Sequence, residues 1–232
     1  MIEHEWWDYE TPDELAEALA GDVHYILSGA ISEKEQALAV FPGGATPLKT
    51  LEKLAEADLD WSRVTIVPTD DRMVAFTDPA SNAGMLARIL APLGATIVPL
   101  TEGGNGDAAA AARTANARLR ALDWAPDLVW LGVGADGHVA SIFPGPDLSA
   151  ALEAPHLAVA VTPHPLPAEA PYPRVTLTRT AILAADAMTF ALQGQEKRAV
   201  LEQAIADGPS SRFPVGRLLA DAEQAIDIHW CP

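Results

Sequence analysis

The stretch Leu128-Val129-Trp130-Leu131-Gly132-Val133-Gly134-Ala135-Asp136-Gly137-His138 indicates the fold of this chain. Its first four residues form a short apolar run, which predicts a buried strand, and glycines 132, 134 and 137 follow that strand. Glycines at this spacing match the dinucleotide-binding fingerprint, which requires a helix that continues from the last glycine. Pro144 and Gly145 leave little room for such a helix, so we do not expect a nicotinamide cofactor.

Short apolar runs alternate with longer helical stretches on both sides of this segment. Further strands are predicted at residues 37–41, 64–67, 96–98, 158–161, 174–177, 187–192 and near 226, and helices from residues 46, 81, 107 and 196. The alternation predicts an α/β fold with a Rossmann-like, mainly parallel sheet that carries helices on both faces. Because these elements are equally dense on both sides of the proline-rich segment 162–173, we interpret that segment as an ordered surface loop or lid, and we expect one domain over residues 1–232.

A further helix is predicted near the N-terminus. Thr11 can cap it, Pro12 suits its first position, and Glu14 completes a capping box. An apolar face follows these residues, and Gly21 is expected to end the helix.

Composition and charge exclude several classes of partner. The chain has 232 residues, of which 49% are hydrophobic, and 32 Asp and Glu oppose 15 Lys and Arg, for a formal net charge of −17. This excess of acid argues against nucleic-acid binding and against docking on an anionic membrane. No signal peptide and no run of about 18 apolar residues is recognisable, and the single cysteine, Cys231, excludes an internal disulfide. We therefore expect a soluble cytoplasmic protein with neither nucleic-acid nor membrane partners.

Ligands of open parallel sheets lie beyond the carboxyl ends of the strands, and the loop after residues 37–41 is suited to one. It contains Gly43 and Gly44, and a helix begins at Thr46. The glycines let the backbone approach a ligand closely, and the free N–H groups of the helix start attract an anion such as a phosphate. An ordinary strand–turn–helix connection would have the same sequence pattern, so this motif alone does not establish a phosphate site.

A carboxylate and an imidazole lie two residues apart in the glycine-rich loop, at Asp136 and His138. Histidine titrates near neutral pH and is the usual general base. The alternative is a structural histidine that is bonded to a loop carbonyl, but the glycine-rich strand end favours the base.

Two further segments contribute cations. Asp71 and Arg72 stand where another strand ends, and Arg72 could hold an anion bidentately or stabilise an oxyanion, although such a cluster is usually a solvated turn. Arg174 and Lys197 follow the proline-rich segment and the last long strand. Each of these two alone would be an ordinary surface cation.

Together these segments resemble the 6-phosphogluconolactonase family, which shares its fold with glucosamine-6-phosphate isomerases and deaminases. The matching pieces occur in the family's order from about residue 37 to 200: residues 43–47, 61–64, 70–72 with 81–82, 132–145, 173–178, and 194 with 197. The resemblance implies hydrolysis of a small phosphorylated sugar lactone, 6-phospho-D-glucono-1,5-lactone, to 6-phosphogluconate in the oxidative pentose phosphate pathway, without a metal or a cofactor.

The resemblance also implies roles for individual residues. His138 would be the general base that activates water, and Asp136 would place the substrate or the imidazole. Arg72 would lie at the substrate, with Asp71 beside it. The groups implied to hold the phosphate are Arg174, Lys197, Gly43, Gly44 and Thr46. Two positions depart from the family pattern, because Ala45 stands where serine is usual and Asp71 where glutamate is usual.

Other functions stay open on the residues alone. In deaminases of this fold the glycine-rich block continues into an Asn-Glu-Pro segment, whereas here Ser141-Ile142-Phe143-Pro144 follows and no glutamate occurs before Glu153. A sugar-phosphate binder without catalysis would use the same cations. A monomer and a small homo-oligomer are equally compatible with the sequence. Because the implied substrate is an anion, we expect a small positive crevice in an otherwise acidic surface.

Overall fold

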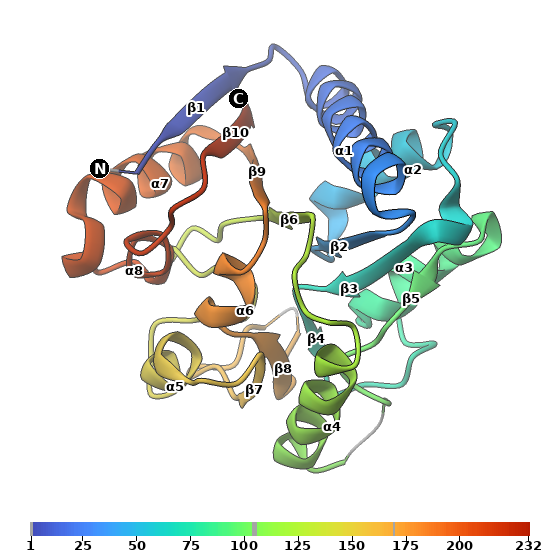
Figure 1. The fold of residues 1–232 in the computed structure, drawn as a ribbon. Coiled ribbons are helices and arrows are strands. Elements are labelled where there is room, and N and C mark those ends of the chain that lie inside the picture. Colours follow the sequence, from blue (N-terminus) through green and yellow to red (C-terminus); the bar gives the residue numbers. More distant parts are fainter. Residues whose placement is uncertain (1, 104–105, 169) are drawn as a thin grey trace.

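A seven-stranded sheet, in which every neighbouring pair of strands is parallel, runs through the protein (Figure 1). The computed structural model describes residues 2–103, 106–168 and 170–232. From one edge to the other the strands are β1 (His4–Asp8), β10 (Ile226–Cys231), β9 (Ala187–Gln193), β6 (Leu128–Leu131), β2 (Ala37–Phe41), β3 (Val64–Pro68) and β5 (Thr96–Ile97). The predicted α/β fold with a mainly parallel sheet is confirmed.

Helices cover both faces of this sheet. Alternate residues of a strand point to opposite faces, and in β2 Ala39 and Phe41 belong to one core whereas Val40 belongs to the other. The first core is closed by α1 (Pro12–Lys34), α2 (Ala45–Ala55) and α3 (Asn82–Leu90), and the second by α4 (Ala108–Arg120), α7 (Gln195–Asp207) and α8 (Pro214–Leu219). Burial on both faces is the reason that the strands read as short, continuously apolar runs.

Three short strands form a second, antiparallel sheet, in the order β4 (Asp70–Arg72), β8 (Arg174–Leu177) and β7 (Ala158–Val161). The sequence predicts β7 and β8 as strands, but it predicts neither β4 nor the antiparallel pairing. The register sets Arg72 directly opposite Arg174, which brings together two cations that are far apart in the sequence. The remaining elements are α5 (Leu148–Glu153), α6 (Arg179–Leu183) and 3₁₀ turns at Trp61–Arg63, Ala91–Leu93 and Gly208–Ser210.

The first helix begins as predicted but does not end at Gly21. Thr11 caps α1, since its Oγ1 accepts a hydrogen bond from the N–H of Glu14 at 3.2 Å. The helix then continues to Lys34 and stops at Glu35, which has a left-handed φ of 62°. Glycine costs a helix interior only about 1 kcal/mol relative to alanine, and the side chains that α1 buries beyond Gly21, such as Val23 and Leu27, outweigh that cost.

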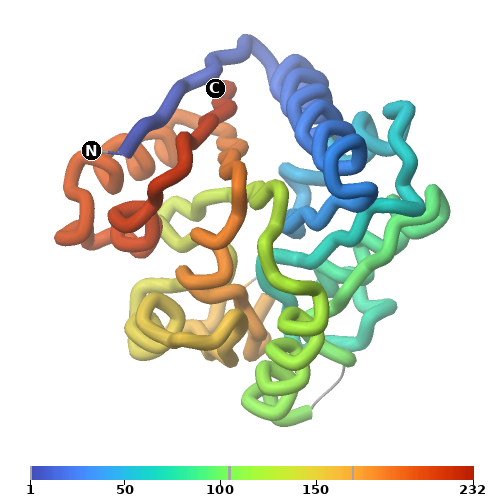
Figure 2. Tube along the Cα trace, viewed as in Figure 1, coloured from blue at the N-terminus to red at the C-terminus, as the bar shows by residue number. Residues whose placement is uncertain are grey.

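The N-terminal strand β1, which the sequence does not predict, pairs with the C-terminal strand β10 at one edge of the sheet. Figure 2 shows the first and the last strand of the chain side by side, with N and C at opposite ends of the pair. Most of β1 is exposed, so its sequence lacks an apolar run. The guanidinium of Arg198 lies 4.7 Å from the ring of Trp6 and 4.5 Å from the ring of Trp230, and it thereby fastens β1 to α7 and β10.

The order of the strands reverses between β2 and β6. From β2 the chain moves outward to β3 and β5, and it then returns to the other side of β2, where β6, β9 and β10 follow. In open parallel sheets a ligand crevice forms at such a switch point, outside the carboxyl ends of the strands. The loop that starts at Pro42 and the loop that starts at Gly132 leave the sheet at this point. In the described parts of the chain, no helix has both the length and the apolarity needed to cross a membrane.

Candidate active site

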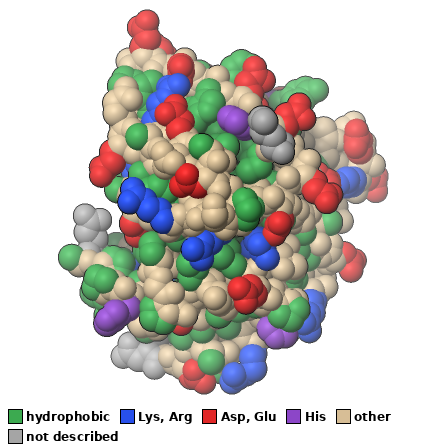
Figure 3. Space-filling view, turned by 90° about the vertical axis from the view of Figure 1, so that its left-hand side faces the viewer, with side chains coloured by type: hydrophobic (Ala, Val, Ile, Leu, Met, Phe, Trp, Pro, Cys, Tyr) green, Lys and Arg blue, Asp and Glu red, His purple; other side chains and the backbone are tan. Residues whose placement is uncertain are grey.

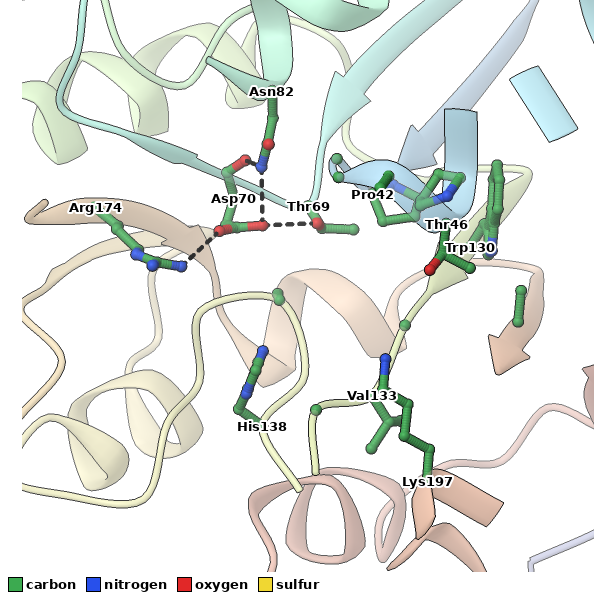
Figure 4. A pocket seen from close by; sticks show the side chains of 18 of the residues that line it. Pro42, Thr46, Thr69, Asp70, Asn82, Trp130, Val133, His138, Arg174 and Lys197 are labelled. Atoms are coloured by element: carbon green, nitrogen blue, oxygen red, sulfur yellow. Dashed lines mark hydrogen bonds and ion pairs between the residues drawn. The ribbon is translucent and has the colours of Figure 1, made fainter. Parts of the chain in front are cut away.

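A cavity of about 220 Å³ lies at this switch point, at the carboxyl ends of β2, β3, β6 and β9 (Figure 4). Its lining includes seven of the predicted site residues: Gly43, Gly44, Thr46, Arg72, His138, Arg174 and Lys197. Asp136 lines a larger neighbouring cavity instead, and Asp71 lines neither. The parallel sheet therefore gathers loops that are far apart in the sequence, from Gly43 to Lys197, around one space.

The N-terminus of α2 forms one wall of this cavity. Gly44 precedes the helix with a φ of 107°, and no side chain caps the helix start. Uncapped N–H groups and the positive end of the helix dipole attract an anion, as the sequence predicts. Gly43 is required for a different reason, because a Cβ there would lie 1.9 Å from Oδ1 of Asn82. Lys49, on the next turn, points elsewhere and pairs with Asp13.

Lys197 reaches the cavity from another strand end. It lies in the first turn of α7, which begins after Gly194, a residue with a φ of 91°. Figure 4 shows its side chain pointing into the cavity. Lys197 takes part in none of the ion pairs found among the described residues. A half-buried ammonium without an acidic partner among the described residues is suited to an anionic ligand.

His138 and Asp136 form a close pair. Nδ1 of His138 lies 2.5 Å from Oδ1 of Asp136, and the same oxygen accepts a hydrogen bond from the backbone N–H of His138 at 3.1 Å. Because a carboxylate only accepts, Nδ1 carries the hydrogen and Nε2 is the lone-pair nitrogen. Burial raises the pKa of Asp136, but the hydrogen bond and the charge of His138 outweigh burial and leave this pKa below its ordinary value.

The backbone beside this pair contains a glycine for steric reasons. A Cβ on Gly134 would lie 2.2 Å from Nδ1 and Cε1 of His138 and 2.6 Å from Oδ1 of Asp136. The imidazole of His138 and the carboxylate of Asp136 would both have to move if residue 134 were alanine. The second glycine of the predicted fingerprint thus makes room for an imidazole, and no helix follows it before α5 begins at Leu148.

The two arginines of the small sheet lie side by side at the cavity. Nη1 of Arg72 donates to Oδ1 of Asn82 at 2.5 Å and to the carbonyl of Ala80 at 3.1 Å. Nη1 of Arg174 donates to Oγ of Ser141 at 3.2 Å. Both Nε atoms are buried and have no hydrogen-bond partner among the described residues. Two adjacent guanidinium groups with spare donors create a second region of positive potential.

Asp70, which the sequence prediction left out of the site, balances part of this charge. It is buried and lies 3.8 Å from Nη1 of Arg174. It also accepts hydrogen bonds from Oγ1 of Thr69 at 3.0 Å and from Oγ of Ser141 at 2.5 Å. Burial lowers the pKa of Arg174, and Asp70 partly opposes that effect. Recognition of residues 70–72 as a strand would have revealed Asp70. Adjacent residues of a strand point to opposite sides, so only one of the two acids can face the cavity.

Asp71 does not reach the cavity, and the expectation that it binds the substrate is corrected here. Its carboxylate is fully buried and accepts hydrogen bonds from the backbone N–H groups of Arg72, Asn82 and Ala83 at 2.8–3.1 Å. Burial raises the pKa of Asp71 to about 6, although these hydrogen bonds act in the opposite direction. Asp71 therefore fastens the start of α3 to β4 and holds Asn82 in place.

The grouping of Arg174 with Lys197 around one phosphate also needs correction. Figure 4 shows these side chains on opposite sides of the cavity, with His138 between them. Arg174 is 4% exposed, and its Nη atoms are engaged by Ser141, Ala170 and Asp70. The cavity thus has two separate cationic ends. Lys197 and the start of α2 form one, and Arg72 and Arg174 form the other.

A larger cavity of about 1000 Å³ adjoins the first one. Arg72, His138 and Arg174 line both cavities, so the imidazole stands at their boundary. The proline-rich segment covers this second space with residues 163–168 and 170. Within the described parts of the chain, no three His, Cys, Asp or Glu side chains come together in a way that could hold a metal ion.

This arrangement defines an α/β protein with a histidine–aspartate pair beside a cavity that is lined by cationic side chains. The chain belongs to the glucosamine-6-phosphate isomerase/6-phosphogluconolactonase family, whose model matches residues 10–230. The family predicted from the sequence is therefore confirmed. Within it, relatives by sequence include several 6-phosphogluconolactonases.

Three comparisons illustrate the similarity. A 6-phosphogluconolactonase of Pseudomonas putida is 38% identical over 238 residues, which cover 99% of this chain and 92% of the relative. One of Mesorhizobium japonicum is 36% identical over 232 residues, which cover 99% and 96%. The crystal structure of a 6-phosphogluconolactonase from Shewanella baltica matches with a TM-score of 0.90 and 31% identity, and covers 99% of this chain and 98% of that one. A monomeric glucosamine-6-phosphate deaminase shares the fold, with a TM-score of 0.81 at 18% identity.

Proposed function

We propose that this chain hydrolyses 6-phospho-D-glucono-1,5-lactone to 6-phospho-D-gluconate in the oxidative pentose phosphate pathway. One observation carries the proposal: an imidazole whose Nδ1 is tied to Asp136 at 2.5 Å stands between the two cationic ends of one cavity. The relatives that carry the 6-phosphogluconolactonase name support the same activity. The enzyme would act in the cytoplasm as one catalytic domain, as a monomer or a small homo-oligomer, without nucleic-acid or membrane partners.

The two cationic ends determine how the substrate would be oriented in the cavity. The phosphate would lie against the start of α2 at Gly44 and Thr46 and against Lys197, where N–H groups and an ammonium are free. The lactone carbonyl would then lie toward His138 and the arginines. The sequence resemblance placed Arg174 at the phosphate, whereas its buried position beside Arg72 suits the carbonyl end.

The chemistry follows from this direction. Nε2 of His138 takes a proton from water as the water oxygen bonds to C1 of the lactone, and the carbonyl electrons move onto the carbonyl oxygen. Spare guanidinium donors, of Arg72 above all, stabilise that oxyanion. When the carbonyl re-forms, the bond between C1 and the ring oxygen breaks, and the imidazolium gives its proton to the ring oxygen. Asp136 keeps the imidazole in the tautomer that this sequence requires and stabilises the imidazolium.

The charge of the protein makes this local arrangement necessary. A net charge of −17 repels a phosphorylated substrate from a distance. Figure 3 shows acidic side chains scattered over the face that it presents, with basic side chains among them. Binding therefore depends on the few cations that line the cavity and on the helix start, which act at short range.

A deaminase reaction of the same fold is the second candidate, and the cavity disfavours it. No glutamate is present in the lining of either cavity among the described residues, and the first cavity contains a single carboxylate, that of Asp70. Asp70 is already engaged by Arg174 and Ser141. Release of ammonia from glucosamine 6-phosphate at a rate comparable to lactone hydrolysis would reverse this order.

The test of the proposed function is a single substitution at the base. His138→Ala is expected to lower kcat for the phosphorylated lactone by about 10²–10⁴-fold, which is the usual contribution of a general base. Formation of 6-phosphogluconate is measured on freshly prepared lactone and corrected for spontaneous ring opening. A His138→Ala protein with near-wild-type kcat would rule out this mechanism, and binding of the phosphosugar by the wild type without turnover would support a binding protein instead.

A further inference from the structure

The ring of Phe143 touches both ends of the catalytic arrangement. It stacks on the imidazole of His138, with ring centroids 4.3 Å apart and an interplanar angle of 27°. The guanidinium carbon of Arg174 lies 5.1 Å from the centroid of the same ring. We propose that Phe143 is a positioning residue, which holds the imidazole of His138 in its working orientation. This inference rests on the proposed role of His138 as the base.

The backbone explains how residue 143 returns to residue 138. Val139 forms isolated bridges with Val133 and with Ile142, so the chain folds back on itself within a few residues. Ala140 adopts a left-handed φ of 51° to make this turn possible. Val139 and Ile142 are fully buried, and they fix the loop in the core beneath the site. Phe143 is thereby presented to the imidazole by a rigid segment.

Two restraints act on the imidazole at different positions. Asp136 holds Nδ1 through a hydrogen bond in the ring plane, and Phe143 covers one face of the ring. The hydrogen bond alone leaves the ring free to swing about that contact, whereas a stacked face prevents the swing. Together they direct Nε2 toward the water that attacks the lactone. A small displacement of a nucleophile or a base lowers the reaction rate strongly, so the second restraint contributes to the rate.

The stack also has an electrostatic consequence. The face of an aromatic ring is negative and attracts cations, and the imidazole becomes a cation when it takes the proton from water. The ring of Phe143 therefore also stabilises the imidazolium that forms during the proposed reaction.

The test compares leucine, which keeps much of the apolar volume, with tyrosine, which keeps the ring. Phe143→Leu is expected to lower kcat about three- to tenfold with KM changed less than about twofold, in line with the strength of an aromatic pair. Phe143→Tyr is expected to restore kcat. Phe76→Leu is the matched control, since Phe76 is 42% exposed and lines neither cavity.

A second readout does not depend on activity. In NMR spectra of the wild type, the ring protons of His138 should be shifted upfield by the stacked ring, and this shift should vanish in Phe143→Leu and in a second non-aromatic variant, Phe143→Met. An unchanged His138 spectrum and an unchanged kcat in folded Phe143→Leu would overturn the inference, as would equal defects in the leucine and tyrosine variants. Absence of lactonase activity in the wild type, with the NMR shifts as expected, would instead refute only the proposed function.

Discussion

Replacing Gly134 by alanine is a test of the catalytic pair that leaves both of its members in place. The new Cβ would lie 2.2 Å from Nδ1 and Cε1 of His138, whereas ordinary contacts of a Cβ begin at about 3.4 Å. The imidazole must therefore move by more than about 1 Å. The backbone cannot yield easily, because the N–H of Gly134 donates to the carbonyl of His138 at 2.9 Å and the N–H of Gly137 donates to the carbonyl of Gly134 at 2.9 Å.

The size of the effect follows from this displacement. A misplacement of about 1 Å at a reacting group costs on the order of 10²-fold in rate, or about 2.7 kcal/mol of activation free energy. The full contribution of a general base, 10²–10⁴-fold, sets the upper limit. We expect kcat of Gly134→Ala to fall about 100-fold. KM should change little, because the proposed phosphate contacts come from other elements, the start of α2 and Lys197 on α7.

The assay is steady-state hydrolysis of freshly prepared phosphorylated lactone, with a thermal melt to show that the variant is folded. Gly132→Ala is the comparison, since a Cβ there meets no atom within 4 Å. Its methyl group would enter the cavity, so it is allowed to change KM but should keep kcat. Gly134→Ala with a normal melt and kcat within about threefold of the wild type would refute the argument that this imidazole, in this position, is the base.

Two further predictions test the phosphate end of the cavity and the buried carboxylate of Asp71. Lys197→Met should raise KM about tenfold, the value of one charge-assisted hydrogen bond, and should weaken inhibition by inorganic phosphate, with kcat nearly unchanged; equal losses in kcat and kcat/KM would place Lys197 at the reacting centre instead. Burial raises the pKa of Asp71 from 3.8 to about 6, so the folded state binds this proton more tightly, and about 3 kcal/mol of stability that is present below pH 4 is lost as the pH rises through 6. Urea denaturation between pH 4 and 7.5 should therefore show a weaker loss of stability with rising pH in Asp71→Asn than in the wild type, and parallel curves would contradict this.

The parts of the fold that the sequence predicts are those in which neighbouring residues determine the structure. The strands at 37–41, 64–67 and 128–131 are buried on both faces, so their apolar runs are uninterrupted. The loops after them carry glycines because backbone and side chains approach closely there, as at Gly43 and Gly134. These local signals were sufficient to bring seven of the nine predicted site residues to one cavity.

The errors concern interactions between distant segments. The pairing of β4 with β8 joins residues 70–72 to residues 174–176, and no local pattern in three polar residues reveals it. That pairing decides which acid of the Asp70-Asp71 pair faces the cavity, because a shift of one residue would exchange their directions. It also places Arg174 beside Arg72 rather than beside Lys197. The extension of α1 past Gly21 has the same origin, since packing of the helix face overrides a local stop signal.

The local positive charge of the site follows from how the basic residues are partnered. Over most of the surface, Lys and Arg side chains are held by acids: Lys34 by Asp127 and Asp186, Lys49 by Asp13, Arg179 by Asp221, and Arg198 by Asp8 and Glu202. At the cavity, by contrast, Arg72 and Lys197 have no acidic partner within 4.0 Å among the described residues, and Arg174 has Asp70 alone, at 3.8 Å. A chain with 32 acidic residues and 15 basic ones can therefore have a cationic cavity. It needs no excess of basic residues, because few acidic side chains lie close to the cations of this cavity. A phosphorylated lactone that overcomes the repulsion of the surface meets Arg72 and Lys197, two cations without an acidic partner among the described residues, in the cavity that His138 lines.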